Sequence, residues 1–271
     1  MPELPEVETT CRGIRPHIDG QTIKRIDVRN GQLRWPVSDE IYALRDTEVV
    51  SIKRRAKYIL IELASGNHLL LHLGMSGSLR ISDPAEELRK HDHLIFHLSN
   101  GLEMRLHDPR RFGCALWVEN AVDDHPLFSK LGPEPLSDAF TLPHFIQTCA
   151  KRDRAIKLHI MDNAIVVGVG NIYACESLFI AGTHPKRSAN KISKARLTKL
   201  YDAIRFVLAR SIEQGGTTLK DFLHSDGQPG YFKQQLEVYD REGQNCRKCD
   251  TSIKRIVLGQ RSTFYCPKCQ S

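Results

Sequence analysis

The chain is 271 residues long, with 41% hydrophobic and 26% charged residues. These fractions are typical of globular proteins and exclude a mostly disordered chain, and the length favours two or three domains. Lysine and arginine total 39 against 32 aspartate and glutamate, which gives a formal net charge of +7. A basic excess suggests a polyanionic partner without proving one, because many mildly basic proteins bind no nucleic acid.

The first ten residues, MPELPEVETT, contain three glutamates. A secretory signal would need a basic region followed by an apolar run, and the sequence has no uninterrupted window of about 18 apolar residues. We therefore expect a cytosolic protein. In a reducing compartment the eight cysteines are not expected to form a disulfide framework, so closely spaced cysteines indicate metal binding first.

Residues 1–132 are predicted to form an antiparallel β-sandwich domain that begins with a helix. Apolar residues spaced three or four apart over residues 7–14 predict that helix. From about residue 22 to 118, β-branched and apolar runs indicate strands, and Ser-Gly-Asn at 65–67 and Ser-Asn-Gly at 99–101 are typical hairpin turns. The clearest predicted strands are 58–63, 69–73, 94–98 and 102–106.

A helical second domain is predicted over residues 133–235. The predicted helices are 142–151, 156–161, 172–180 and 193–214. The last helix is amphipathic, with Ser193 as a plausible N-cap and Gly215-Gly216 as its end. Residues 217–232 contain glycine and proline and predict a loop. A cysteine-bearing third domain over 236–271 completes an α+β fold.

The third domain contains two cysteine pairs with the spacing of a zinc site. Cys246-Arg-Lys-Cys249 and Cys266-Pro-Lys-Cys269 are separated by sixteen residues, which matches a tetrahedral four-thiolate site. Four protein ligands leave no open position, so we expect one structural zinc ion. The other four cysteines are scattered and are expected to be core residues: Cys11, Cys114, Cys149 and Cys175.

Residues 241–271 contain seven lysines or arginines against two acidic residues. Segments 253–258 and 262–265 can pair as a hairpin about residues 259–261, which would place Arg261 at or near its tip. A zinc-stiffened ribbon with a basic tip suits insertion along a DNA groove. The alternative is a small stabilising clip with solvated charges.

The N-terminus offers an unusual nucleophile. Initiator methionine is normally removed before proline, which would leave Pro2 with a free secondary amine. An α-amino group has a pKa of about 7.7–8.0, so a useful fraction is neutral at pH 7. Attack on a sugar C1′ would give a cationic iminium that acidifies the C2′ proton, and Glu3 offers a carboxylate for proton transfer. Alone this is weak evidence, since glutamate favours a first helical turn anyway.

Several motifs together give the sequence a family resemblance. They are MPELPEVET at the start, LGMSGSL at 73–79, HDPRRFG at 107–113, GVGNIYA at 168–174, and the four-cysteine tail. Together they resemble formamidopyrimidine-DNA glycosylase, a bacterial family that excises 8-oxoguanine and ring-opened purines and also acts as an AP lyase. The resemblance runs from the first residue to the last. It implies an N-terminal β-sandwich, a helix-two-turn-helix domain and a zinc ribbon.

The resemblance also implies catalytic roles for four residues. Pro2 would be the Schiff-base nucleophile and Glu3 the proton donor or shuttle. Lys57 would donate a proton in β-elimination, and Arg261 would serve δ-elimination and hold a phosphate. The implied partner is double-stranded DNA with oxidised bases or abasic sites, acted on by a monomer at the nucleoid of a bacterial cytosol.

Base flipping leaves a gap in the duplex that must be filled. Met75, Arg110 and Phe112 match the residues that fill it in this family. A thioether and an aromatic ring can occupy the gap, and a guanidinium can hydrogen-bond the orphaned cytosine. Taken separately, each residue could instead be a core residue or part of a surface ion pair.

Phosphate contacts are predicted at a helix start and at scattered polar residues. Gly-Val-Gly-Asn at 168–171 precedes an apolar helical run, so backbone amides and Asn171 can meet a phosphate there. The further predicted contacts with the DNA backbone are Lys57, His72, His91, Arg152 and Tyr239. Within Lys-Arg-Asp-Arg at 151–154, the sequence does not show which basic residue faces DNA. Residues 217–231 resemble the mobile loop that closes over the flipped base.

Two other functions stay open on sequence grounds. One is an oxidised-pyrimidine glycosylase with the same chemistry, although Leu4 and Val7 fit the oxidised-purine branch better. The other is a zinc-ribbon DNA-binding protein without catalysis. Comparing the excision of 8-oxoguanine with that of thymine glycol tests the first alternative. The chemical identity of the mature N-terminus tests the second.

Overall fold

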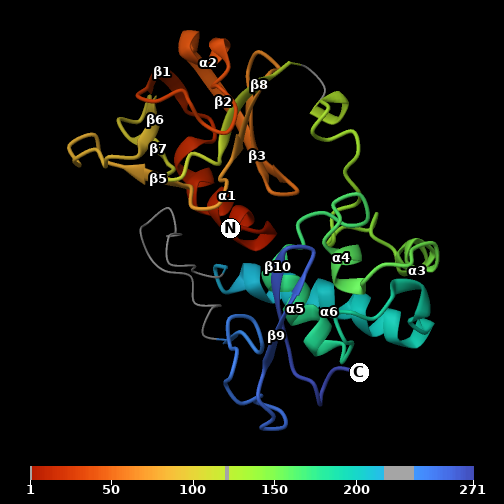
Figure 1. Cartoon of the computed structure of the whole chain (residues 1–271). Coiled ribbons are helices and arrows are strands. Elements are labelled where there is room, and N and C mark those ends of the chain that lie inside the picture. The colour runs from red at the N-terminus through yellow and green to blue at the C-terminus, as the bar shows by residue number, and fades with distance from the viewer. Residues whose placement is uncertain (1, 120–121, 217–234) are drawn as a thin grey trace. The chain divides into compact units, whose positions relative to one another are not determined.

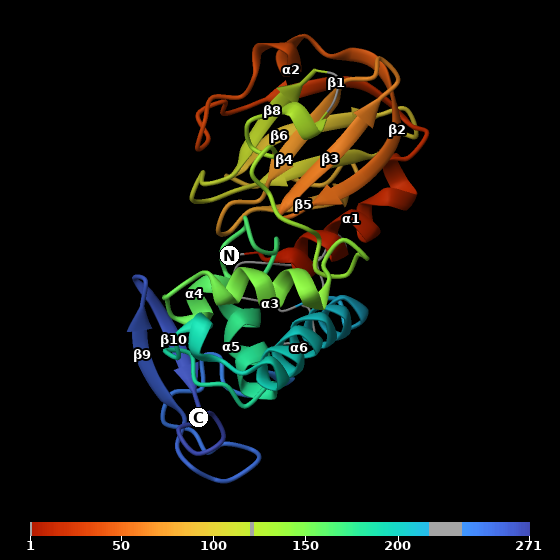
Figure 2. The same cartoon turned by 90° about the vertical axis from the view of Figure 1, so that its right-hand side faces the viewer.

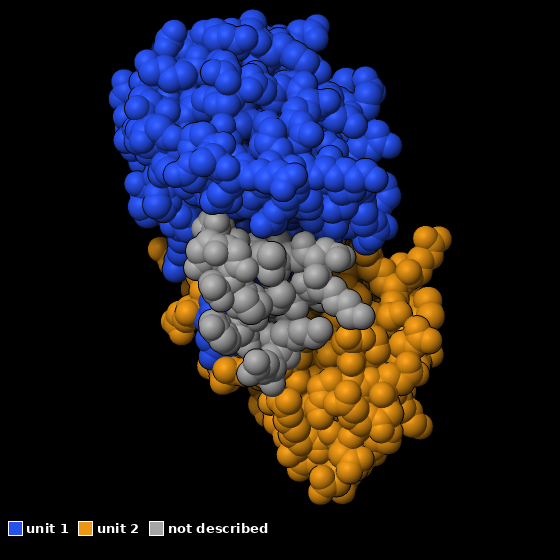
Figure 3. Space-filling view, turned by 90° about the vertical axis from the view of Figure 1, so that its left-hand side faces the viewer, with its two compact units in different colours: residues 1–129, 214–233 blue, residues 130–213, 234–271 orange. Residues whose placement is uncertain are grey.

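The computed structural model describes residues 2–119, 122–216 and 235–271. They form two compact units, drawn as ribbons in Figure 1 and coloured separately in Figure 3. The first unit comprises the described residues up to Ser129 and residues 214–216, and the second comprises Lys130–Glu213 and the described residues from 235 onward. Helical and cysteine-bearing segments thus share one unit, and the division into three domains stays a prediction. None of the described helices is long and apolar enough to cross a membrane.

An eight-stranded antiparallel sheet forms the first unit, with the strand order β5-β7-β6-β1-β2-β3-β4-β8. The strands are β1 (Thr22–Val28), β2 (Arg45–Arg55), β3 (Tyr58–Leu63), β4 (His68–His72), β5 (Ser78–Ser82), β6 (Asp92–Leu98), β7 (Glu103–His107) and β8 (Cys114–Val118). The four predicted strands correspond to β3, β4, β6 and β7. The early part of β2, residues 45–48, pairs with β1, and its later part pairs with β3 from Val49 onward, with a register shift between Val49 and Ser51. This strand therefore joins the two halves of the predicted sandwich.

One apolar core fills the first unit. Helix α1 (Leu4–Ile18) buries Val7, Cys11 and Ile14 in it, which confirms the predicted apolar face. The helix contacts β2 and β5, strands from both halves of the sheet, and its position beside β5 is visible in Figure 2. A short helix, α2 (Asp39–Ala43), adds Ile41 to the same core. A 3-10 turn, η1 (Val122–Asp124), lies near the end of this unit.

The second unit contains the predicted helices and the predicted hairpin. Its elements are α3 (Leu142–Ala150), α4 (Ile156–Ile160), α5 (Asn171–Ile180), η2 (Ala189–Lys191), α6 (Lys194–Glu213), β9 (Lys254–Leu258) and β10 (Arg261–Tyr265). Helix α5 is buried along residues 172–179 and contacts α4, α6 and β10. Helix α3 packs against α6 and η2.

Helix α6 begins and ends where the sequence predicts. Its N-terminal turn follows Ser193, whose Oγ lies 3.5 Å from the backbone nitrogen of Arg196. The helix ends at Glu213, and Gly215 and Gly216 follow with φ of +75° and +77°. Left-handed backbone of this kind terminates helices and is accessible to glycine without a steric penalty. The buried face carries the apolar residues expected, namely Leu197, Leu200, Ile204, Val207, Leu208 and Ile212.

Candidate nucleic-acid interface and zinc centre

The start of α1 fixes the carboxylate next to Pro2. Glu3 is the N-cap residue, and its side chain accepts the backbone N–H of Glu6. In return, Oε2 of Glu6 accepts the Glu3 N–H at 2.8 Å, so the two residues form a reciprocal capping box. Glu3 and Glu6 are 2% and 1% exposed, and Pro2 is buried. The backbone around Pro2 is thus held by two charge-assisted hydrogen bonds.

Lys57 lies in the tight turn between β2 and β3. Arg55 pairs with Tyr58 across that turn, and Ala56 within it has a φ of +54°. The guanidinium of Arg54 fastens the turn, because NH1 donates to the Ala56 carbonyl at 3.0 Å. The Nε of the same guanidinium donates to Glu8 on α1, also at 3.0 Å. Arg54 therefore ties the helix that begins beside Pro2 to the hairpin that presents Lys57.

His72 is the last residue of β4. Its imidazole is neutral at neutral pH. Burial, together with the nearby charges of Lys57 and Arg34, lowers its pKa to about 4. Its Nδ1 accepts the Gly74 N–H at 2.9 Å, so the proton of the neutral ring belongs on Nε2. His72 also lines a cavity of about 390 Å³. Its predicted phosphate contact would then be a neutral N–H donor.

The structure brings Met75 and Phe112 together at this same cavity. Both side chains are partly exposed, 39% and 44%. The Arg110 guanidinium carbon lies 4.9 Å from the Phe112 ring centroid, so the third predicted gap-filling residue is adjacent. Gly74 allows this approach: its φ is +62°, and a Cβ there would lie 2.4 Å from the Phe112 carbonyl carbon. Only glycine lets the two loops meet so closely.

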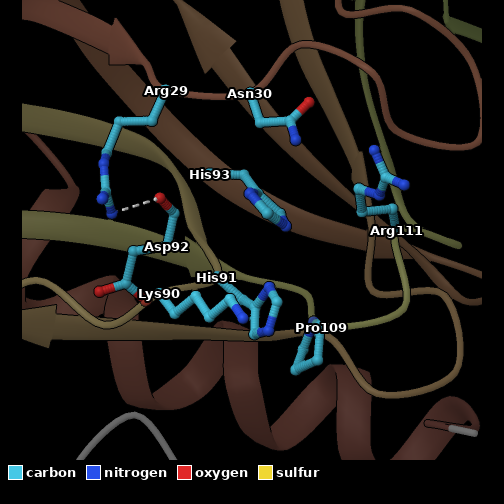
Figure 4. Close-up of a pocket in the computed structure, with 8 residues that line it drawn as sticks. All are labelled: Arg29, Asn30, Lys90, His91, Asp92, His93, Pro109 and Arg111. Atoms are coloured by element: carbon cyan, nitrogen blue, oxygen red, sulfur yellow. Dashed lines mark hydrogen bonds between the residues drawn. The ribbon is translucent and has the colours of Figure 1, made fainter.

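A buried aspartate organises the loop that carries Arg110 and Phe112. Asp108 is fully buried, and its Oδ2 accepts the Gly113 N–H at 2.8 Å. Its backbone carbonyl accepts the Arg111 N–H at 3.1 Å. The predicted contact residue His91 lies apart from the Met75 cavity, in a second pocket that Figure 4 shows.

In the second unit, Asn171 opens α5 directly after its N-cap, Gly170. The Asn171 side chain accepts from Lys157 Nζ and donates from Nδ2 to the Ser262 carbonyl at 2.9 Å. Lys157 is fully buried and donates as well to Thr263 Oγ1 at 2.7 Å. These contacts tie the start of α5 to β10. The Asn171 side chain is thus engaged within the unit, and its contact with a phosphate stays a prediction.

The four residues of the basic segment 151–154 have different surroundings. Arg154 donates to Asp162 at 2.8 Å and to His159 Nδ1 at 3.3 Å, so its charge is engaged within the unit. Asp153 accepts a hydrogen bond from Ser188. Arg152 is exposed after the end of α3, as is Lys151. The surroundings thus favour Arg152 or Lys151 over Arg154 as a DNA contact.

Tyr239 is positioned by a buried carboxylate. Glu176 on α5 is buried, and it accepts backbone N–H bonds from Glu237, Val238 and Tyr239 at 2.8–3.0 Å. Burial raises the pKa of Glu176, while the three N–H donors act in the opposite direction. The Tyr239 ring packs edge-on against Phe264 in β10, with centroids 5.2 Å apart.

The four cysteine sulfurs of the tail form one cluster. Sγ atoms of Cys246, Cys249, Cys266 and Cys269 all lie within 4.8 Å of one another. Individual pairs are 3.4, 3.5 and 3.9 Å apart. Tetrahedral zinc with Zn–S bonds of about 2.3 Å requires S–S separations of about 3.8 Å. The donor set fits one structural zinc ion, as the spacing predicted, and the other four cysteines are buried as expected.

The hairpin beside the zinc cluster presents Arg261 next to its tip. Arg261 pairs with Leu258, so the turn has two residues, Gly259 and Gln260, and not the three predicted. Their φ values of +53° and +61° suit the tight turn that matches strand twist. Arg261 is exposed as the first residue of β10.

Four positioning residues were not predicted from the sequence. They are Glu6, Asp108, Lys157 and Glu176. Glu6 had a usable signal, because an acidic residue three positions after an N-cap is typical of a capping box. Lys157 and Glu176 are buried charged residues within apolar stretches, and their partners are distant in sequence. Asp108 lies in a polar segment and holds the loop that follows it through N–H groups three and five residues away.

The first unit has a helix that begins beside a buried proline, and the second carries a four-cysteine cluster that fits zinc. These are the features of a zinc-containing protein. Three family models cover most of the chain. The formamidopyrimidine-DNA glycosylase N-terminal domain matches residues 1–115, the formamidopyrimidine-DNA glycosylase H2TH domain matches 131–223, and a zinc finger found in FPG and IleRS matches 243–271.

Relatives named formamidopyrimidine-DNA glycosylase from Salmonella arizonae and Klebsiella pneumoniae are 58% and 57% identical over 270 residues, with 100% of each chain covered. The crystal structure of the MutM (Fpg) protein from Thermus thermophilus matches with a TM-score of 0.90 at 38% identity, covering 99% of this chain and 98% of that one. A Lactococcus lactis Fpg complex with abasic-site DNA matches with a TM-score of 0.92 at 30% identity over both full chains. The chain belongs to the formamidopyrimidine-DNA glycosylase family, and it is a DNA glycosylase with the predicted α+β fold.

Proposed function

We propose that this chain excises oxidised purines, such as 8-oxoguanine and formamidopyrimidines, from double-stranded DNA and then cleaves the abasic strand. The observation that carries the proposal is the buried Pro2 beside Glu3, whose carboxylate is fixed by the Glu6 N–H. The Lactococcus lactis relatives were solved with abasic-site and Fapy-dG DNA, which supports this substrate class. The role is base excision repair.

The first step uses the Pro2 nitrogen after removal of Met1. Its lone pair forms a bond to C1′ of the damaged nucleotide, and the electron pair of the glycosidic bond leaves with the base, which takes up a proton. The nitrogen then gives up its N–H proton. Opening of the C1′–O4′ bond then gives an iminium, with a proton delivered to O4′. Glu3 is placed to donate and recover such protons, and general acid–base transfer of this kind contributes typically 10²–10⁴-fold.

Strand cleavage follows from the same iminium. Loss of the C2′ proton expels the 3′ phosphate in β-elimination, and a second elimination expels the 5′ phosphate. Lys57 is the proposed proton donor of the β-elimination, and Arg261 is proposed to serve the δ-elimination and to hold a phosphate. The Arg54 contacts that fasten the Lys57 turn to α1 support the first assignment, and the exposure of Arg261 next to the hairpin tip supports the second.

Flipping a base out requires that the gap be filled. Met75 and Phe112, which line one cavity, and Arg110, which stacks on Phe112, are the proposed gap-filling group. The proposed contacts with the DNA backbone are His72, His91, Arg152, Asn171 and Tyr239. The loop 217–231, proposed to close over the flipped base, lies outside the described residues. We propose further that the protein acts on chromosomal DNA at the nucleoid, in the cytosol, as a monomer.

Borohydride reduction tests the proposal. It should trap a covalent protein–DNA adduct through the Pro2 nitrogen during turnover of an 8-oxoguanine duplex. Protein whose N-terminus is chemically blocked, or that retains Met1 by mass spectrometry, should form none, because its nitrogen is no longer a secondary amine. Undiminished trapping by the blocked protein would refute the nucleophile. Preferred excision of thymine glycol over 8-oxoguanine would instead favour an oxidised-pyrimidine enzyme.

A further inference from the structure

Two loops of the first unit meet beside the Met75 cavity. The methionine loop, residues 73–77, connects β4 to β5, and the arginine loop, residues 108–113, connects β7 to β8. Their backbones approach each other closely at two glycines, because a Cβ at Gly113 would lie 2.5 Å from the carbonyl oxygen of His72, just before the methionine loop. The other close approach is the one already described at the start of the methionine loop. Neither loop can shift far without displacing the other.

Each loop combines exposed side chains with a buried base. Met75 and Phe112 are partly exposed, and Arg110 stacks on the Phe112 ring. Their neighbours Ser76 and Gly113 are buried. The side chains proposed to enter the duplex are thus mounted on residues that are shielded from solvent.

Asp108 fixes the start of the arginine loop to the sheet. Its backbone N–H donates to the His91 carbonyl at 3.0 Å. Its own carbonyl oxygen lies 2.9 Å from Nε2 of the buried His93. Because a carbonyl oxygen can only accept, His93 donates this bond. Asp108 is therefore held by the segment that begins β6.

The two oxygens of the Asp108 carboxylate serve different loops. Oδ2 accepts the Gly113 N–H at 2.8 Å, at the end of the arginine loop. Oδ1 accepts the Ser76 hydroxyl at 3.4 Å, in the methionine loop. Ser76 directly follows Met75, and Gly113 directly follows Phe112. One fully buried carboxylate thus joins the residues next to both partly exposed side chains.

We propose that Asp108 is a positioning residue that joins the two loops into one wedge, so that Met75 and Phe112, with Arg110 stacked on it, enter the duplex together. This inference rests on the proposed gap-filling role of those three residues. Side chains that are held in one arrangement before DNA binds need no further ordering when they enter the gap. Removing either Met75 or Phe112 should then disable the whole wedge.

The test is a double-mutant cycle on the zinc-loaded full chain. Two duplexes are compared at the same salt concentration, one fully paired and one with a stable abasic analogue opposite cytosine. The measured quantity is the gap preference, the ratio of the two affinities, in which contacts common to both duplexes cancel. Met75→Ala and Phe112→Ala are measured alone and together. The combined loss of gap preference should be smaller than the product of the two single losses by about threefold or more, because residues in one network are not additive.

Ser76→Ala tests whether the carboxylate carries this coupling. The change removes one hydroxyl and leaves Met75 and Phe112 in place. In a Ser76→Ala background the two single losses should multiply. Ser78→Ala is the matched control, because it is the same change at the buried first residue of β5, and it should leave the coupling unaltered.

The conservative change at Asp108 provides a rescue. In Asp108→Asn the amide oxygen can accept the Gly113 N–H, and the NH₂ group can donate to the Ser76 oxygen. The coupling should therefore survive. Asp108→Ala loses both bonds, so the single losses should multiply in its background as they do with Ser76→Ala. Should Asp108→Ala unfold, Ser76→Ala decides alone.

The outcomes are distinct. Coupling that is present in the unmodified chain and absent in Ser76→Ala supports the proposal. Coupling that persists in Ser76→Ala overturns it, since direct contact between Met75 and Phe112 would then be sufficient. Losses that already multiply in the unmodified chain overturn it as well. Failure of the proposed function would look different, because the unmodified chain would then have no gap preference, and the gap-filling role would fail together with the wedge.

Discussion

The two units hold their proposed functional residues in different ways. In the first unit, Glu3 is fixed by Glu6 three residues away, within the first turn of α1. In the second unit, the residues near Asn171 and Tyr239 are held by Lys157 and Glu176, whose partners lie tens of residues away. The proposed nucleophile and its neighbouring carboxylate are thus held by a local motif, whereas the proposed DNA contacts Asn171 and Tyr239 are held by long-range packing.

Removing the zinc should separate the two units most strongly, because only the second contains the four ligands. Zinc supplies about 10–16 kcal/mol to the folding of zinc-finger peptides, so Cys249→Ser should unfold the ribbon. The apolar core of the first unit contains none of the four ligands and should stay folded. Zinc analysis and limited proteolysis measure both effects. Cys149→Ala, at a buried cysteine outside the cluster, should keep its zinc. A variant that lost zinc but kept full DNA affinity would contradict the proposed role of the ribbon.

Glu3→Gln tests the chemistry of the first unit alone. A glutamine oxygen can still accept the Glu6 N–H, so the helix cap should survive, but the side chain can no longer transfer a proton. We expect base excision to slow by about 10²–10⁴-fold with unchanged thermal stability. Single-turnover kinetics and calorimetry measure the two quantities. The control is Glu40→Gln, the same charge change at an exposed position on α2. A large loss of stability would show that Glu3 is structural.

Whether the partners of a residue are near or distant in sequence also decides whether the sequence could predict its role. Helix and strand periodicity placed α1, β3 and α6, because those patterns are set by neighbours along the chain. Cysteine spacing placed the zinc cluster for the same reason. Lys157 and Glu176 could not be predicted, since a buried charge inside an apolar helix has meaning only with its distant partner. The roles of Pro2, Glu3 and the DNA contacts came from resemblance, and their geometry supports them as proposals.

The first unit also contains a buried charge with partners distant in sequence, Asp92. Burial alone would raise its pKa, but hydrogen bonds from His107 and Arg80 outweigh burial and hold the pKa well below its usual range. A depressed folded-state pKa contributes stability above the unfolded value of about 3.9 and loses it as pH falls below that value. Asp92→Asn leaves Arg80 without its charged partner, so it should cost about 3–5 kcal/mol at pH 7.

Urea unfolding at pH 7 and pH 3 measures this effect. The difference between Asp92→Asn and the unmodified chain should shrink at pH 3, because the unfolded chain binds a proton at Asp92 there and the folded chain does not. Asp46→Asn, in an exposed pair with Lys24, should cost at most about 1 kcal/mol at either pH. If the difference in unfolding free energy between Asp92→Asn and the unmodified chain is the same at pH 7 and pH 3, the Asp92 charge is not what stabilises the fold.

Glu176→Gln is the corresponding change in the second unit. The glutamine offers one acceptor oxygen and an NH₂ group that would face a backbone N–H donor, so one buried N–H loses its partner. This should cost about 1–3 kcal/mol. DNA affinity should fall as well, because the segment that bears Tyr239 loses its anchor. Unfolding and binding curves measure both, with Glu242→Gln, in an exposed pair with Arg255, as control. If stability falls while DNA affinity is unchanged, Tyr239 does not contribute to the DNA interface.

The smallest expected effect is at Arg261. Because it is exposed at the start of β10, Arg261→Ala should leave folding unchanged and remove one phosphate contact. The slope of log K against log salt should then decrease by about 0.9. Arg255→Ala removes the same charge from β9, where the guanidinium pairs with Glu242 at 2.8 Å, and should not alter the slope. Equal slopes for both variants would mean that the hairpin contributes general charge and no specific phosphate contact at its tip.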